Sequence, residues 1–210
     1  MATPVYDIDL FDTSAATIAG LKSAGRRVIC YFSAGSYEDW RPDAATFPAA
    51  TLGNPLDGWP GERWLDTRAT AVRDIMKARM DLALSKGCDA IDPDNIDGYT
   101  NSPGVPLTAA TQLDYNRFLA NEAHARHLAV GLKNDLDQIR DLVSYYDFAV
   151  NEQCFQYSEC DLLTPFISAQ KPVYEIEYST STSICGAANA AGFDTLLKNL
   201  DLGAYRVPCR

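Results

Sequence analysis

The segment GCDAIDPDNIDGY, which spans Gly87–Tyr99, decides the fold class of this chain of 210 residues. Gly87 is suited to end a helix, because glycine readily adopts the left-handed backbone found at helix ends. The apolar run that follows carries two acidic residues, Asp92 and Asp94, at its far end. A buried strand with polar side chains at its carboxyl end is typical of parallel α/β proteins. The segment therefore predicts one helix–strand unit of such a fold.

Outward from this segment, the same order of helix and strand repeats. An apolar stripe before Gly87 predicts a long helix. Thr13 or Ser14 is suited to begin an earlier helix, and Thr108 is suited to begin a later one. Shorter helices are expected at residues 136–143 and 193–200. Strands are expected at Val5–Leu10, Arg27–Phe32, Ala90–Asp94, Ala129–Lys133, Phe148–Glu152, Val173–Tyr178 and Gly203–Val207, with a very short one at Trp64-Leu65. Such repeated units predict the α/β class, with helices outside a parallel sheet.

No linker or internal repeat interrupts the chain, so a single domain over residues 1–210 is expected. The longest irregular stretch runs from Ser33 to about Glu62, and a loop of that length is usually functional.

Composition narrows the function classes. Lys and Arg number 18 against 28 Asp and Glu, which gives a net charge of −10. Nucleic acid is a poor partner for such a surface, whereas an acidic field concentrates cationic ligands. No apolar run reaches the roughly 18 residues that span a bilayer, so no membrane insertion is expected. Neither G-x-G-x-x-G nor G-x-x-x-x-G-K occurs, and no cofactor is expected.

The cysteines bear on the compartment. Cys154 and Cys160 enclose a short polar segment and are expected to form a disulfide, because their spacing lacks the C-x2-C hooks of structural zinc. Cys30 lies inside an apolar strand and is as well explained by a buried free thiol. A disulfide favours an oxidising compartment, so we expect a secreted protein. The start MATPVYDIDL does not resemble a signal peptide, and the leader is expected to be absent from this sequence.

Two kinds of hydrolytic centre fit the sequence poorly. His124 and His127 sit on one predicted helix away from strand ends, and no third metal ligand is evident. The acidic residues from Asp92 to Asp97 lack the glycine and glutamate of a calcium-binding hand. Ser36 lacks the second glycine of a nucleophile elbow. No metal site and no serine nucleophile are therefore expected.

A pair of carboxylates remains as the chemical centre. Five of the predicted strands end in acidic or amide residues, and the carboxyl ends of parallel strands share one face. Glycoside hydrolysis needs two carboxyl groups and no cofactor. Sugar sites also need flat aromatic surfaces, and aromatic residues cluster in or beside the strand-end loops. These aromatic residues are Tyr31, Tyr37, Trp40, Trp59, Trp64 and Tyr99.

Five segments of the chain resemble glycoside hydrolase family 114, the endo-α-1,4-polygalactosaminidases. The segments are Cys30–Asp43, Gly58–Asp66, Gly87–Tyr99, Asp147–Cys154 and Tyr174–Tyr178. The resemblance implies a secreted TIM-type (β/α) barrel that cuts galactosamine-containing polysaccharide. It implies Asp94 as nucleophile and Glu152 as acid/base. Asp92 is the rival of Asp94, since residues two apart on a strand face the same side; Asp94 is preferred because it lies nearer the carboxyl end.

We expect further residues to contact the substrate, a cationic amino-sugar polymer. They are Asp7, Asp9, Tyr31, Ser33, Tyr37, Trp40, Asp92, Asp97, Tyr99, Lys133, Asn134, Glu175, Glu177 and Tyr178. Acidic residues beyond the catalytic pair would bind a protonated 2-amino group. The protein is expected to be a monomer.

The chain departs from the family in one respect. The aromatic-rich first strand, of the type W-x-W-x-L, does not precede the segment YDIDL. The expected barrel therefore lacks its usual first strand, which exposes a parallel edge. A non-catalytic carbohydrate-binding barrel and a hydrolase of neutral α-galactosides stay open as alternatives.

Overall fold

The computed structural model describes residues 3–179 and 181–210. The chain forms two compact units, Met1–Val130 and Gly131–Arg210, called here the N-terminal and C-terminal units. Each unit is described by itself. The single domain over residues 1–210 stays a prediction.

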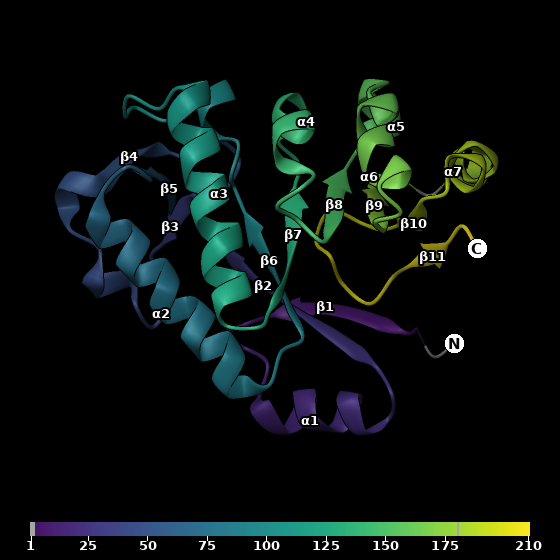
Figure 1. Ribbon diagram of the computed structural model, residues 1–210, viewed down its shortest axis with the longest axis horizontal. Helices are drawn as coiled ribbons and strands as arrows, with labels where there is room; N and C mark the ends of the chain where they lie inside the picture. The colour runs from purple at the N-terminus through teal and green to yellow at the C-terminus, as the bar shows by residue number, and fades with distance from the viewer. Residues whose placement is uncertain (1–2, 180) are drawn as a thin grey trace. The chain divides into compact units, whose positions relative to one another are not determined.

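Parallel strands joined by helices make up the main sheet of the N-terminal unit (Figure 1). The strands, in their order in the sheet, are β1 (Val5–Asp9), β2 (Arg27–Ser33), β6 (Ala90–Asp94) and the start of β7 (Ala129–Lys133). The helices are α1 (Ala15–Ser23), α2 (Thr70–Lys86) and α3 (Ala109–Ala125). Helices α2 and α3 lie side by side, and Arg73 on α2 pairs with Asp114 on α3 at 2.6 Å.

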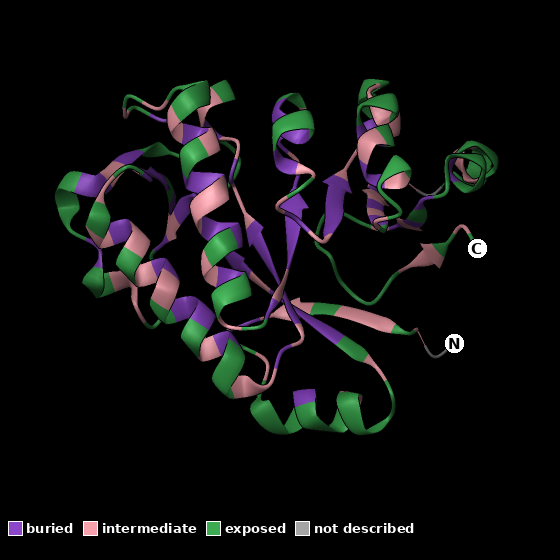
Figure 2. Ribbon diagram, viewed as in Figure 1, coloured by how far each residue is buried: buried purple, intermediate pink, exposed green. Residues whose placement is uncertain are grey.

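The predicted helix ends are confirmed. The side chain of Ser14 accepts a hydrogen bond from Thr17 N, and Thr108 forms a reciprocal capping box with Thr111. Gly87 ends α2 with a φ of 88°. Buried residues line the inner faces of α2 and α3, and exposed residues lie on their outer faces (Figure 2). The core of this unit therefore lies between these helices and strands β2 and β6.

The expected irregular stretch after β2 contains a small antiparallel sheet. Its order is β3 (Ser36–Glu38), β5 (Glu62–Leu65) and β4 (Leu52–Pro55). Two 3-10 turns, Ala44–Thr46 and Ala49–Thr51, lie between β3 and β4. The short strand expected at Trp64-Leu65 therefore exists as part of β5, and it pairs in this small sheet rather than with the parallel strands.

The C-terminal unit continues the strand–helix pattern. Its strands are the remainder of β7, then β8 (Phe148–Glu152), β9 (Val173–Glu177), β10 (Asp194–Leu197) and the antiparallel β11 (Val207–Pro208). Its helices are short: α4 (Ile139–Leu142), α5 (Cys154–Tyr157), α6 (Thr164–Ser168) and α7 (Cys185–Ala191).

Two expectations for the last part of the chain are wrong. The apolar spacing over residues 193–200 fits a helix, yet this region holds strand β10, which pairs in parallel with β9. Gly192 ends α7 with a φ of 82°, so the chain turns directly into the strand. The strand expected at Gly203–Val207 is reduced to β11, because Val207 and Pro208 alone pair with β10.

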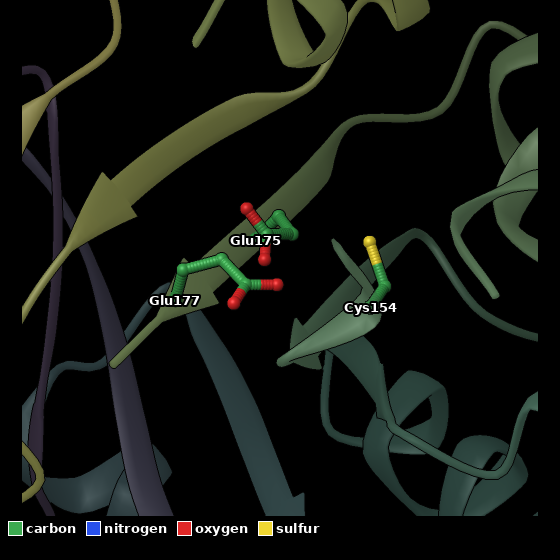
Figure 3. Close-up of side chains that lie close together, drawn as sticks. All are labelled: Cys154, Glu175 and Glu177. Atoms are coloured by element: carbon green, nitrogen blue, oxygen red, sulfur yellow. The ribbon is translucent and has the colours of Figure 1, made fainter. Parts of the chain in front are cut away.

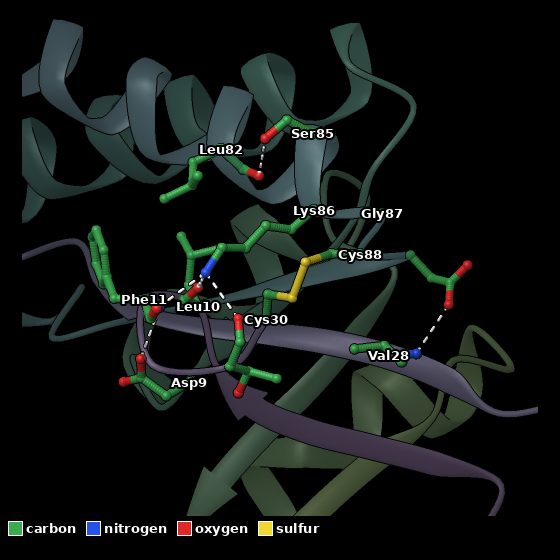
Figure 4. Close-up of a disulfide and its surroundings, with 12 residues drawn as sticks. Asp9, Leu10, Phe11, Val28, Cys30, Leu82, Ser85, Lys86, Gly87 and Cys88 are labelled. Carbon is green, nitrogen blue, oxygen red and sulfur yellow. Dashed lines mark hydrogen bonds between the residues drawn. A yellow bond between two sulfur atoms is a disulfide. The ribbon is translucent and has the colours of Figure 1, made fainter. Parts of the chain in front are cut away.

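Disulfides join three pairs of cysteines. Cys154–Cys160 is confirmed, and Cys185 pairs with Cys209. Cys30 is not a free thiol, because it is bonded to Cys88 beyond the end of α2 (Figure 4). Within the described residues, no helix is both long and apolar enough to cross a bilayer.

Candidate active site

Asp94, the last residue of β6, has a hydrogen bond on each carboxylate oxygen. Tyr31 Oη donates to Oδ2 at 2.9 Å, and the backbone N–H of Asn95 donates to Oδ1 at 2.8 Å. The residue is half-buried, whereas Asp92 on the same strand is only 2 % exposed. Asp94 is therefore both oriented and accessible, which favours it over Asp92 as a reacting group.

The backbone around Asp94 is held closely. The N–H groups of Ala34 and Gly35 donate to the carbonyl of Asp94 at 2.8 and 3.0 Å. A Cβ on Gly35 would lie 1.7 Å from the carbonyl oxygen of Asn95, so only glycine fits there. Asn95 itself has a φ of 60°, in the left-handed region.

Behind Asp94 runs a chain of polar side chains that ends at Glu62. Asn95 Nδ2 donates to Ser33 Oγ at 3.0 Å, the hydroxyls of Ser33 and Ser36 are 2.6 Å apart, and Ser36 Oγ donates to Glu62 Oε2 at 2.7 Å. Burial raises the pKa of Glu62 to about 6. Ser33 thus belongs to this buried chain, away from solvent.

The predicted site residue Asp9 is engaged in an ion pair. Arg41 donates to both of its carboxylate oxygens, at 3.0 and 2.7 Å, and also lies 2.8 Å from Glu38 Oε1. Asp9 Oδ1 accepts the N–H groups of Phe11 and Asp12 as well. The carboxylate of Asp9 therefore organises its own loop, and we leave it out of the proposed substrate contacts.

The remaining predicted residues of the N-terminal unit differ in exposure. Asp7 on β1 is exposed, and Trp40 is 52 % exposed. Tyr37 is half-buried and packs edge-on against Phe47. Asp97 and Tyr99, in and beside the turn Gly98–Thr100, are half-buried.

The other aromatic residues of this unit also divide by exposure. Trp59 is 50 % exposed, and Trp64 is buried. Trp59 therefore presents a flat surface to solvent, as Trp40 does, while Trp64 serves packing.

In the C-terminal unit, Glu152 is the last residue of β8 and is also half-buried. Tyr178 Oη donates to its Oε1, and Asn134 Nδ2 donates to its Oε2 at 3.3 Å. Lys133 Nζ lies 3.6 Å from Oε2. Asn134 Oδ1 in turn accepts the backbone N–H of Glu152 at 3.0 Å. Three predicted site residues, Lys133, Asn134 and Tyr178, are thus brought to this carboxyl group.

Glu175 and Glu177 are two residues apart on β9, so they face the same side of that strand, and both lie beside Cys154 (Figure 3). Glu175 is 0 % and Glu177 4 % exposed, so neither presents an oxygen to a sugar in solution. Glu177 Oε1 accepts the N–H groups of Phe155 and Gln156 at 2.7 and 3.3 Å. We leave both glutamates out of the proposed substrate contacts.

The same cluster has the residue types of a metal site. Potential ligand atoms of Cys154, Glu175 and Glu177 lie within 4.8 Å of one another. The sulfur of Cys154 is bonded to Cys160 and is therefore not a thiolate, the form in which cysteine binds metals. Burial raises the pKa of Glu175 well above that of an ordinary carboxyl, and the neighbouring Glu177 adds to the rise.

Sequence reasoning missed Ser36 and Glu62 as site residues. Both lie in segments quoted for the family resemblance, yet nothing local to either residue indicates that they meet. Strand pairing of β3 with β5 places Ser36 opposite Trp64 and Glu38 opposite Glu62.

Comparisons with known proteins bear on the fold and the family of the chain. A solved structure of Aspergillus fumigatus Ega3 in complex with galactosamine is 48 % identical, covers 99 % of this chain and 88 % of its own, and has a TM-score of 0.95. The glycoside hydrolase domain of PelA from Pseudomonas aeruginosa is 14 % identical, covers 97 % of this chain and 90 % of its own, and has a TM-score of 0.76, which shows the fold alone.

An uncharacterized protein of Deinococcus radiodurans is 26 % identical over 184 residues, which are 78 % of this chain. The matched part spans 60 % of that protein's length. The parallel strands joined by helices are those of an α/β protein of the TIM-type (β/α)-barrel class, and the expected fold class is confirmed. The model of the glycoside-hydrolase family GH114 matches residues 1–210, and the chain belongs to this family.

Proposed function

We propose that this protein is an endo-acting, retaining glycoside hydrolase that cleaves α-1,4-galactosaminidic bonds. Asp94 is its nucleophile and Glu152 its acid/base. Membership of family GH114 supports the reaction class. The galactosamine bound by the A. fumigatus relative supports an amino sugar as substrate.

The observation that carries the proposal is the position, burial and orientation of the carboxyl groups of Asp94 and Glu152. Each is the last residue of a parallel strand, each is half-buried, and each is oriented by neighbouring side chains. In (β/α) barrels the carboxyl ends of the strands carry the active site. The two donors on Asp94 suit a group that must attack as a carboxylate.

The proposed reaction has two steps. An oxygen of Asp94 attacks the anomeric carbon while Glu152 gives its proton to the leaving glycosidic oxygen. Glu152 then takes a proton from water, and the resulting hydroxyl displaces Asp94 from the sugar. Two inversions leave the product with the α configuration of the substrate.

The substrate is proposed to be cationic. Asp7 on β1 and Asp97 in the loop after β6 both reach solvent, and the whole chain has a net charge of −10. Asp92 is only 2 % exposed and is left out, as Glu175 and Glu177 are. A carboxylate and a protonated 2-amino group form a charge-assisted hydrogen bond, worth about 1.5–3 kcal/mol. Acetylation of the amine removes that bond. Acetylation of the polymer and added salt should both weaken its binding.

We also propose an extracellular location and a monomeric state. The three disulfides support the location, since such bonds persist in oxidising compartments.

The test is reducing-end release from a de-N-acetylated α-1,4-galactosamine polymer, with chitosan and a neutral α-galactan as controls. Asp94→Asn and Glu152→Gln should each lower turnover by at least about a thousandfold with unchanged circular dichroism. Asp57→Asn, an exposed acidic residue on the loop between β4 and β5, is the matched control. Release from the neutral polymer alone would favour a galactosidase, and binding without release a carbohydrate-binding barrel.

Azide separates the two roles. With Asp94→Gly, azide occupies the nucleophile's side and should give a β-glycosyl azide. With Glu152→Ala, azide displaces Asp94 from the covalent intermediate and should give the α product. If azide restored the activity of Asp92→Gly and not that of Asp94→Gly, Asp92 would be the nucleophile in place of Asp94.

A further inference from the structure

We propose that Glu62 is a positioning residue for Asp94, which it holds through the side chains of Ser36, Ser33 and Asn95. The inference rests on the proposed role of Asp94 as nucleophile. It concerns the N-terminal unit alone, where all five residues lie.

The contacts fix the direction of each side-chain hydrogen bond in the series from Asn95 to Glu62. Ser33 Oγ accepts from Asn95 Nδ2 at 3.0 Å and from the backbone N–H of Ser36 at 3.0 Å. Both of its lone pairs are therefore occupied, and its own hydrogen points to Ser36 Oγ, 2.6 Å away. The hydrogen of Ser36 then goes to Glu62 Oε2. Each group donates toward Glu62, which terminates the chain as an acceptor.

The other end of this hydrogen-bond series is Asn95, the residue that contacts the proposed nucleophile Asp94. Asn95 donates its backbone N–H to Asp94 Oδ1 and has a left-handed backbone, which asparagine adopts more readily than most residues other than glycine. The close approach of Gly35 to the carbonyl of Asn95 leaves that peptide little room to move. The Asn95 side chain is therefore the link between Glu62 and the orientation of Asp94.

The charge of Glu62 sets the strength of this link. A carboxylate accepts a charge-assisted hydrogen bond, which is about twice as strong as a neutral one, and successive bonds in a chain strengthen one another. When Glu62 gains a proton, Ser36 loses its charged acceptor. The hold on Asn95, and with it on Asp94, is then weakened.

The groups around Glu62 account for where it titrates. Burial is the largest cause of its raised pKa, about 6, and the charges of Glu38 on β3 and Asp94 on β6 raise it further. The hydrogen bond from Ser36 and the charge of Arg41 lower it. Strand β4, with the sequence LGNP, brings no charged side chain. Glu62 thus changes charge within the range in which an enzyme is assayed.

Kinetics test the role. Glu62→Gln keeps an acceptor for Ser36 but removes the charge, and Ser36→Ala keeps the charge but breaks the chain. We expect each to lower kcat by about tenfold to a hundredfold at pH 7, as a small displacement of a reacting group does. KM should change by less than about twofold, because the substrate contacts stay in place. The wild type should lose kcat as the pH falls through about 6, and Glu62→Gln should lack that limb.

A purely structural role would lower thermal stability and leave the pH profile of kcat in place. Glu122→Gln, which removes a carboxylate from the surface ion pair with Arg126, is the matched control and should keep the wild-type profile. Wild-type kcat with the acid limb intact in both Glu62→Gln and Ser36→Ala would overturn the inference.

Asp94→Asn separates this inference from the proposed function. If Asp94→Asn is inactive while Glu62→Gln behaves as the wild type, this inference alone is wrong. If Asp94→Asn retains turnover, the proposed nucleophile is wrong and the role of Glu62 falls with it.

Discussion

The N-terminal unit buries Glu38 beside two arginines, whereas the C-terminal unit buries Glu175 beside a second glutamate. Arg41 lies 2.8 Å and Arg79 3.9 Å from Glu38, and both guanidinium groups stack over Phe11. No Lys or Arg occurs in α5, α6 or α7 to serve Glu175.

Desolvation raises the pKa of both glutamates, but their neighbours then act in opposite directions. The arginines lower the pKa of Glu38, while Glu177 raises that of Glu175 further. A guanidinium within reach thus favours the ionised form of a buried carboxyl group, so that it offsets part of the rise in the pKa of Glu38, whereas no such cation offsets the rise in the pKa of Glu175. The first arrangement balances the buried charge with cations, and the second reduces it through the raised pKa of Glu175.

Removal of Arg79 should have the largest effect on stability. This residue is 1 % exposed, forms two hydrogen bonds to Asp43 and donates to the carbonyl of Ser33. Arg79→Met would leave Asp43 without its cation and Glu38 with Arg41 alone, at a cost of about 3–5 kcal/mol of unfolding free energy. Urea denaturation at pH 7 measures it. The exposed pair of Arg68 and Asp66 is the control, since Arg68→Met should cost at most about 1 kcal/mol.

The disulfides extend the comparison from charge to chain entropy. Cys30–Cys88 spans 58 residues in the N-terminal unit, and Cys185–Cys209 and Cys154–Cys160 span 24 and 6 in the C-terminal unit. The entropy of loop closure predicts that replacing both cysteines of a bond by serine lowers the unfolding free energy, by about 4, 3.5 and 2 kcal/mol for the three bonds in that order. Denaturant melts of the three variants give the ranking. The reverse order would mean that local packing, not loop length, governs these bonds.

Glu175→Gln isolates the effect of the raised pKa of Glu175. Folding raises the pKa of Glu175, so the folded state binds more protons than the unfolded state between the two pKa values. Wild-type stability should therefore be full below the unfolded value and fall as the pH rises toward about 8.

The Gln variant is uncharged at every pH and should escape the fall. It should match the wild type near pH 4 and exceed it at pH 9 by at least about 1.4 kcal/mol of unfolding free energy, the equivalent of one pKa unit. Thermal melts across pH measure the difference. An equal offset at all pH values would show that Glu175 is ionised in the folded protein.

Helix caps give the smallest expected effect. A neutral hydroxyl, Thr108, caps α3 in the N-terminal unit, whereas the carboxylate of Glu177 accepts two N–H groups of α5 in the C-terminal unit. Thr108→Ala should lower the unfolding free energy by about 1 kcal/mol, and this decrease should not depend on salt concentration. Thr108→Ser, which keeps the hydroxyl, should restore stability. A loss that salt abolishes would point to charge instead of the hydrogen bond.

Local signals in the sequence determined most of the elements. The strands Ala90–Asp94, Ala129–Lys133 and Phe148–Glu152 were predicted with their observed bounds, as were the ends of α2 and α3 at Gly87 and Thr108. Apolar runs and caps act within one turn of a helix or along one strand, so they are readable without the fold.

The same signals failed where spacing alone was ambiguous. Residues 193–200 carry a helical spacing, but pairing with β9 made them a strand. A short apolar run fits either structure until a neighbouring strand supplies hydrogen bonds to its backbone.

Which side chains meet was decided by the tertiary structure alone. The sequence determined that Asp94 and Glu152 end their strands, and that Cys154 is near Cys160. The pairing of Cys30 with Cys88, the burial of Glu175 and the chain from Asn95 to Glu62 join residues or faces that no local pattern relates. Electrostatic and hydrogen-bond energies depend on distances in space and on burial, and the folded chain alone sets both.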